Sequence, residues 1–136
     1  MSDQKEKISL EYIFKTSPGI LFSRLSTASG LSEWFADDVN IKENLFTFIW
    51  DKTEQTARML QKKENKNIRF QWVDDQSNDI VNDEEEDYFE FKITVMELTG
   101  ETALIVTDSL LPEDKADAID LWNEQIDRLR IKLGST

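Results

Sequence analysis

The sequence predicts an α+β domain in which a curved antiparallel sheet of six to seven strands wraps around one long C-terminal helix. Over residues 7–16, and again over most of residues 37–108, apolar residues recur at every second position, which is typical of strands with one buried face. The connections between these segments are short, and short connections join antiparallel strands. From residue 112 onward the apolar residues lie three and four positions apart, as they do in an amphipathic helix.

The first segment, residues 7–16, predicts a half-buried strand, and its alternating apolar positions are Ile8, Leu10, Tyr12 and Phe14. Two short helices are expected after this strand. Ser17 is suited to cap the first of them and Pro18 to occupy its first position. We expect Ser29 to cap the second helix, whose apolar residues lie at positions i, i+3 and i+4, namely Leu31, Trp34 and Phe35.

The middle of the chain predicts six further strands, at residues 38–42, 45–50, 55–63, 68–73, 89–95 and 102–108. The alternation over residues 55–63 is weak, so we expect this strand to be exposed or to lie near an edge of the sheet. The segments 65–67 (NKN) and 99–101 (TGE) are turn signals that separate neighbouring strands.

The last segment predicts a helix that begins at Pro112 and ends near Leu133, where Gly134 stops it. At ~1.5 Å per residue this helix is about 30 Å long. Its apolar stripe consists of Ala118, Ile119, Trp122, Ile126, Leu129 and Leu133. A helix of this kind must bury its stripe, and the inner face of the sheet is the only partner large enough.

The length and the net charge of the chain limit its domain organisation and the classes of function that it can have. The chain has 136 residues, which fits a single domain over residues 1–136, with residues 1–6 expected to be flexible. The net charge of −12 excludes a conventional nucleic-acid binder, which needs a basic face, and argues against adsorption to anionic membranes. No window approaches about 18 consecutive apolar residues, so we expect no stable membrane insertion and a cytoplasmic protein.

Cysteine and histidine are both absent from the chain. Their absence excludes disulfides, thiolate nucleophiles, cysteine-based zinc sites and a Ser-His-Asp triad. Acid–base chemistry would have to use Asp, Glu, Lys, Tyr or Arg. Candidates near the predicted strands are Tyr12, Asp37, Asp38, Arg58 and Arg69, but no spacing selects one of them. We therefore expect no catalytic residues, no metal site and no cofactor.

Four segments resemble the helix-grip fold, which START-like lipid-transfer domains share with the birch-pollen-allergen family and with the activator of heat-shock protein 90 ATPase. The similarity is greatest to the last branch, and the segments are 14–22 (FKTSPGILF), 31–35 (LSEWF), 67–72 (NIRFQW) and the closing helix from Leu121 and Trp122. The resemblance extends over nearly the whole chain. It implies the helix-grip fold, whose families include chaperone activators, lipid carriers and aromatase/cyclases.

This resemblance implies a space between sheet and helix toward which aromatic side chains point. The candidate residues that would line it are Trp34, Phe35, Phe48, Trp50, Phe70, Trp72, Phe91, Trp122 and Ile126. They either enclose an apolar cavity for a lipid or another hydrophobic small molecule, or they fill the core at interior density. In this fold Trp34 and Phe35 would lie near the cavity mouth, where they either gate a ligand or hold the short helices in place.

Residues 74–87 hold eight acidic residues and no basic one. Their spacing is similar to that of an EF-hand calcium loop, but Ile80 stands where the turn needs glycine, so we expect no metal there. A solvated loop is the default interpretation. The alternative is a docking site for a basic protein surface, for which the candidate residues are Asp83, Glu84, Glu85, Glu86 and Asp87.

Three functions follow from these observations. The leading hypothesis is a START-like protein that binds a hydrophobic small molecule between the sheet and the C-terminal helix. The alternative is a protein-interaction module similar to the heat-shock protein 90 activator, without a small-molecule ligand. The third is an enzyme with a buried carboxylate or tyrosine, which we do not expect. We expect a monomer or a weak dimer.

Overall fold

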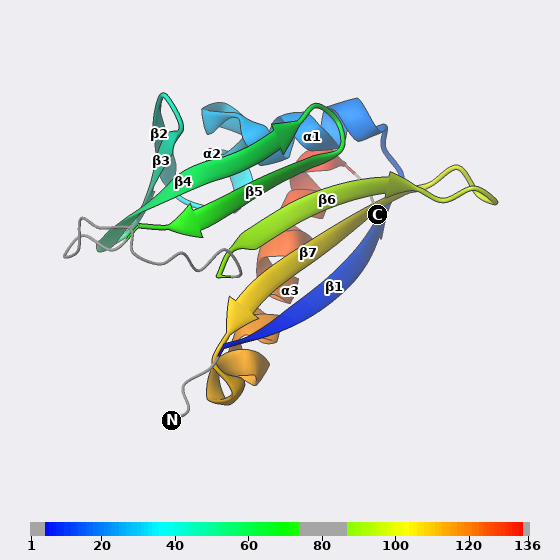
Figure 1. Ribbon diagram of the computed structural model, residues 1–136. Helices are drawn as coiled ribbons and strands as arrows, with labels where there is room; N and C mark the ends of the chain where they lie inside the picture. Colours follow the sequence, from blue (N-terminus) through cyan, green and yellow to red (C-terminus); the bar gives the residue numbers. More distant parts are fainter. Residues whose placement is uncertain (1–4, 74–86, 135–136) are drawn as a thin grey trace.

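The computed structural model describes residues 5–73 and 87–134, and in these residues it contains one seven-stranded antiparallel sheet and a long C-terminal helix (Figure 1). The elements in chain order are β1 (Glu6–Phe14), α1 (Pro18–Ser26), α2 (Ala28–Trp34), β2 (Asp38–Lys42), β3 (Leu45–Trp50), β4 (Thr53–Lys63), β5 (Asn67–Trp72), β6 (Phe89–Val95), β7 (Thr102–Leu110), the 3₁₀ helix η1 (Pro112–Asp114) and α3 (Lys115–Leu133). The predicted helix-grip architecture is therefore confirmed.

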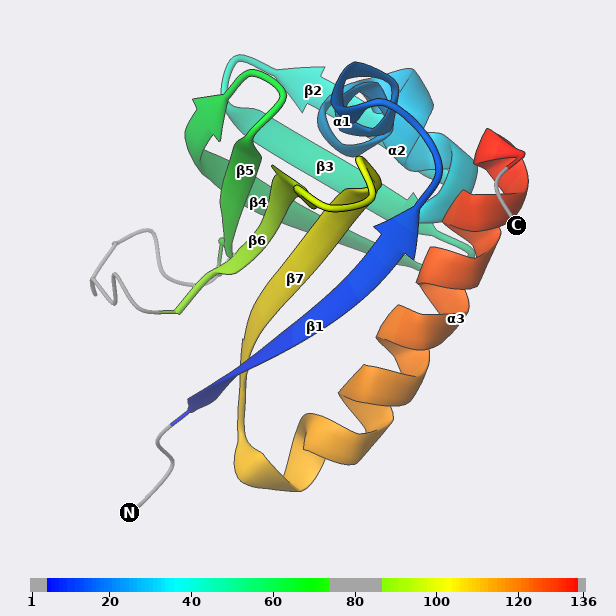
Figure 2. The ribbon, with the colours of Figure 1, turned by 90° about the vertical axis from the view of Figure 1, so that its right-hand side faces the viewer.

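The order of strands across the sheet is β1-β7-β6-β5-β4-β3-β2, so β1 crosses over to pair with β7 and the other strands follow as hairpins. Figure 2 shows the curvature of this sheet, with α3 running past β1 and β7 while α1 and α2 cover one end. None of the helices in the described ranges is both long enough and apolar enough to cross a bilayer.

Several local expectations are corrected. The strand at 55–63 is mostly exposed or half-buried, in keeping with one of the two expected alternatives, but it is not an edge strand, because β4 lies between β3 and β5. Its weak alternation has a physical cause, since a β-bulge between Met59 and Gln61 exchanges the two faces of the strand. Thr27, not Ser29, caps α2: Thr27 is extended and its Oγ1 accepts a hydrogen bond of 2.9 Å from the backbone N–H of Gly30.

Other expectations agree with the structure. Ser17 caps α1, since its Oγ accepts a hydrogen bond of 3.2 Å from the backbone N–H of Ile20. Gly134 ends α3 in a left-handed conformation with φ of 71°.

The N-terminal boundary differs from the expectation. Residues 5 and 6 were expected to be flexible with the rest of the N-terminus, but Glu6 begins β1 and is paired opposite Leu110.

The helix α3 is joined to the strand β1 by polar contacts along its length. Lys115 forms an ion pair with Glu6, the Oη of Tyr12 donates to Asn123, and Arg130 donates to the backbone carbonyl of Ile13. The guanidinium of Arg130 also lies 4.5 Å from the centre of the Phe14 ring. These contacts place α3 beside the inner face of β1, and a space between the sheet and the helices lies next to them.

Close packing of α1 on α2 leads to a test of the fold. A Cβ at Gly30 would lie 2.3 Å from the backbone oxygen of Ser23 and 2.6 Å from the Cα of Arg24, so Gly30→Ala forces the helices apart. We expect the free energy of unfolding in urea to fall by about 1–3 kcal/mol. Gly19→Ala is the control, because its Cβ would meet Asn65 at an ordinary 3.7 Å. Equal stabilities of the two variants would contradict the packing described.

Candidate functional site

Aromatic side chains fill one half of the space between sheet and helices, with Phe35 at their centre. This residue follows the last residue of α2 and is buried. Its ring centroid lies 4.9–6.2 Å from the ring centroids of Phe48, Trp50, Phe89, Phe91 and Trp122. The side chain that directly follows α2 thereby contacts residues of β3, β6 and α3.

The backbone carbonyl of Phe35 makes two further connections. It accepts a hydrogen bond of 2.9 Å from the indole N–H of Trp50 on β3 and one of 3.1 Å from the buried amide of Gln125 on α3. One carbonyl thus satisfies the half-buried indole N–H of Trp50 and the buried amide of Gln125. These two bonds hold β3 and the second half of α3 to the end of α2.

The sequence-predicted cavity residues do come together. All nine except Trp50 and Trp72 are buried, and Trp72 remains 41% exposed at the end of β5. Around Phe35 the rings pack against one another, which agrees with the alternative of a filled core in this half. Their part in holding a ligand stays a prediction.

Trp34 and Phe35 do not lie at an opening. Trp34 is 2% exposed, and its indole N–H donates a hydrogen bond of 2.8 Å to the backbone carbonyl of Arg24. This bond joins α2 to α1, while the ring of Trp34 lies 5.7 Å from that of Phe91 on the sheet. The geometry therefore favours the alternative in which these two residues hold the short helices in place.

At the other end of the space the inward side chains are less deeply buried. The register pairs Leu10 with Val106 and Ile8 with Asp108, and directly opposite residues share one face of a sheet. Val106 is fully buried beside Phe91, yet its neighbours toward the start of β1 and the end of β7 are only half-buried. We call this region the open half of the grip, and its residues are Ile8, Leu10, Asp108, Leu110 and Ile119.

Asp108 is the one carboxylate in this set, and sequence reasoning missed it. Its Oδ2 accepts a hydrogen bond of 2.9 Å from the indole N–H of Trp122, and its Oδ1 accepts one of 2.9 Å from the backbone N–H of Ser109. Burial raises the pKa of Asp108 above its usual value, against the opposing effects of these two bonds and of Lys5. An aspartate in the alternating segment 102–108 was the available signal, because it occupies an inward position.

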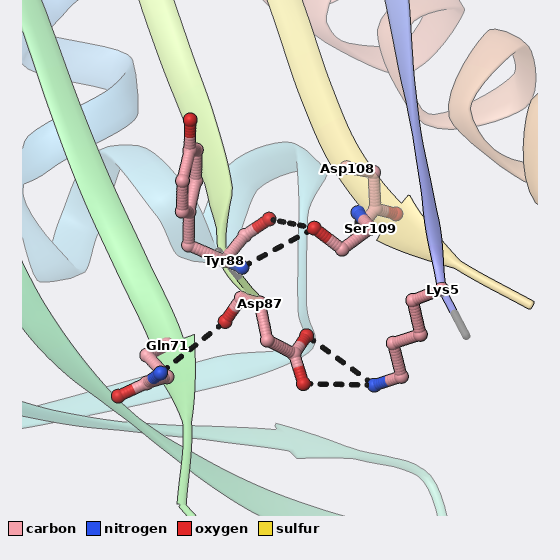
Figure 3. Close-up of polar contacts among 6 residues, drawn as sticks. All are labelled: Lys5, Gln71, Asp87, Tyr88, Asp108 and Ser109. Carbon is pink, nitrogen blue, oxygen red and sulfur yellow. Dashed lines mark hydrogen bonds and ion pairs between the residues drawn. The ribbon is translucent and has the colours of Figure 1, made fainter. Parts of the chain in front are cut away.

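Polar contacts fix the start of β6 next to Asp108 (Figure 3). The Oγ of Ser109 lies 3.3 Å from the backbone nitrogen of Tyr88 and 3.2 Å from its carbonyl oxygen. The amide of Gln71 donates to the backbone carbonyl of Asp87 at 3.4 Å. Strands β5 and β7 thereby hold the residues that lead into β6 from both sides.

The acidic docking hypothesis concerns residues that lie mostly outside the described ranges, since Asp83, Glu84, Glu85 and Glu86 are not described. Asp87 is described. Its carboxylate forms an ion pair of 3.0 Å with Lys5, and its side chain is 42% exposed. Docking of a basic protein at this run stays a prediction.

The candidates for acid–base chemistry are dispersed. Asp37 and Asp38 are exposed, whereas Tyr12 faces α3 and donates a hydrogen bond of 2.7 Å to Asn123. Burial raises the pKa of Tyr12, and the nearby Asp127 raises it further. Within residues 5–73 and 87–134 no group of three or more acidic side chains is placed to hold a metal ion.

A family model for the START-like superfamily domain matches residues 1–135. The solution NMR structure of BfR322 from Bacteroides fragilis has 37% sequence identity and a TM-score of 0.63, over 96% of this chain and 92% of that one. The Aha1 dimer from Colwellia psychrerythraea has 17% identity and a TM-score of 0.73, over 91% and 92% of the two chains.

CalU16 from Micromonospora echinospora has 13% identity and a TM-score of 0.69, over 95% of this chain and 74% of that one. At 17% and 13% identity, the likeness to Aha1 and to CalU16 shows the fold alone. A comparison with curated proteins finds no match.

The raised pKa of Asp108 predicts a pH dependence of stability. Because the folded chain binds this proton more tightly than the unfolded chain, the contribution of Asp108 to stability falls as pH rises from the ordinary aspartate pKa, about 3.9, through the raised value. Asp108→Asn cannot titrate. Urea unfolding between about pH 4 and pH 7 should therefore show the wild type losing stability relative to Asp108→Asn as pH rises. A difference that is independent of pH, or of the opposite sign, contradicts this environment.

Proposed function

Because the chain belongs to the START-like superfamily, as the match over residues 1–135 shows, we propose that it is a binding protein for a hydrophobic small molecule. We place the ligand in the open half of the grip, between β1, β7 and the first half of α3. The half-buried state of the inward side chains there is the observation that carries this proposal.

The chemistry of this half selects the kind of ligand. The apolar side chains of Ile8, Leu10, Leu110 and Ile119 would leave water on contact with an apolar molecule, and each Å² so buried is worth about 25 cal/mol. Asp108 offers hydrogen bonding at the boundary with the aromatic half, beside Trp122. A neutral molecule with an apolar body and one hydroxyl or amide group matches this arrangement. An anionic group would be repelled by Asp108.

We include no catalytic step, because Asp108 has no second titratable group of the described chain in hydrogen-bonding contact with it: its partners are an indole and a backbone N–H. The alternative of a protein-interaction module gains nothing from Asp87, whose carboxylate is paired with Lys5. Cytoplasmic location and a monomeric or weakly dimeric state stay expectations.

Ligand binding can be tested with a neutral fluorescent dye such as Nile red. Ile119→Trp would occupy the open half with an indole ring, and we expect it to weaken dye binding about tenfold or more. Leu121→Trp is the matched control on the same helix, because Leu121 is 53% exposed. We expect its affinity to stay within about twofold of the wild type.

Circular dichroism of both variants establishes that each remains folded. Equal dye affinities of Ile119→Trp and Leu121→Trp would place the dye elsewhere and contradict the proposed site. Absence of saturable dye binding by the wild type would also count against it.

A further inference from the structure

A concave surface lies away from the open half of the grip, where the turn between β4 and β5 meets the end of β6. It is a pocket of about 530 Å³. Such a volume lies in the range of small-molecule sites, about 300–1,000 Å³. Its charged residues are the basic Lys63, Lys66, Arg69 and Lys92 and the acidic Glu90, and the neutral Asn67 lies among them.

The strand register assembles this surface as two rows on the outer face of the sheet. Asn67 lies opposite Lys63 on β4 and opposite Lys92 on β6, so these three residues form one row across three strands. Two positions further along β5, Arg69 lies opposite Gln61 and Glu90, which form the second row. Because strands are about 4.8 Å apart, the stems of Lys63 and Lys92 are roughly 10 Å apart.

The bulge in β4 brings Lys63 to this face. Met59 lies opposite the inward-facing Phe70, and without the bulge Lys63 would point inward with it. The extra residue shifts the register, so that Lys63 instead lies opposite Asn67. The irregularity that weakened the sequence pattern is therefore the feature that gathers the lysines.

In the second row the carboxylate of Glu90 is paired with the guanidinium of Arg69. Glu90 accepts hydrogen bonds from the amide of Asn67 and from Arg69, the latter at 3.3 Å. The amide of Asn67 also donates to Gln61 at 2.7 Å, so these four side chains form a connected floor. Glu90 is the one acidic residue among the described residues that line the pocket.

The lysines of the pocket have no ion-pair partner in the part of the chain that the structure describes. They are Lys63, Lys66 and Lys92, and the described residues that line the pocket carry a surplus of three positive charges in a chain of net charge −12. Pro18 also lines the pocket as the first residue of α1, and a helix N-terminus carries partial positive charge. Like charges that are held close together repel one another, and a bound anion would reduce that repulsion.

We propose that this pocket binds the phosphate group of a small molecule. Lysines bind phosphate as point charges, and the floor of Gln61, Asn67, Arg69 and Glu90 holds the strands that present them. The basic surface spans three strands and is surrounded by an acidic protein, so it suits a compact anion better than a long polyanion such as RNA. This site is independent of the hydrophobic ligand proposed above.

The test is a titration of the ¹⁵N-labelled protein with inorganic pyrophosphate, followed by two-dimensional NMR. We expect saturable shifts at the amides of Lys63, Lys66, Asn67 and Lys92. Replacing the three lysines together (K63Q, K66Q and K92Q) should weaken binding about tenfold or more. The control replaces three exposed lysines elsewhere (K42Q, K52Q and K132Q), alters the net charge equally and should stay within about twofold of the wild type.

Adenosine diphosphate in place of pyrophosphate separates two sources of the phosphate. Tighter binding of the nucleotide, with shifts that extend to Ile93 and Val95, identifies an organic phosphate, whereas equal affinity identifies the phosphate alone. Equal weakening by both triple variants would mean that net charge and not this pocket attracts the anion, and it would overturn the proposal. Absence of saturable shifts would overturn it as well. If the first triple variant fails to fold, Lys92→Gln alone serves the same comparison.

Discussion

The packing of Phe35 is the constraint on which the rest of the grip depends. Its ring is surrounded by aromatic rings of the sheet and of α3, and its carbonyl accepts hydrogen bonds from Trp50 and Gln125. This one residue at the end of α2 therefore sets the separation of β3, α2 and the second half of α3. The second half of α3 is packed tightly against Phe35. Because protein interiors are close-packed, this packing limits how closely the first half of α3 can approach the sheet.

The two halves of α3 differ for this reason. The second half buries Ile126 and Leu129 completely or nearly so, whereas the first half has only the half-buried Ala118 and Ile119 before Trp122. In this first half Lys115 forms an ion pair with Glu6 of β1. Polar contacts at the rim keep the helix in place while leaving apolar surface incompletely covered. This apolar surface is the one that the proposed ligand would cover.

Periodicity predicted the elements of the fold well, because one buried face imposes a period of two on strands and a stripe on α3. It was less informative where local geometry intervenes. The bulge in β4 could not be located from sequence, so the lysine pocket was missed. Phe35 was assigned to an opening by analogy, whereas its position at the end of α2 directs the ring into the core. The inward position of Asp108 follows from its alternation with Leu104 and Val106, but its hydrogen bond to Trp122 depends on how α3 packs on the sheet, which periodicity does not give.

Native mass spectrometry of the protein purified gently from its own cells, with solvent extraction of whatever is bound, tests the central claim most directly. We predict a discrete adduct of a few hundred daltons that is neutral, extractable into organic solvent and absent from the Ile119→Trp variant. A bare mass for the gently purified wild type, or an adduct of unchanged abundance in Ile119→Trp, would contradict a ligand in the open half of the grip.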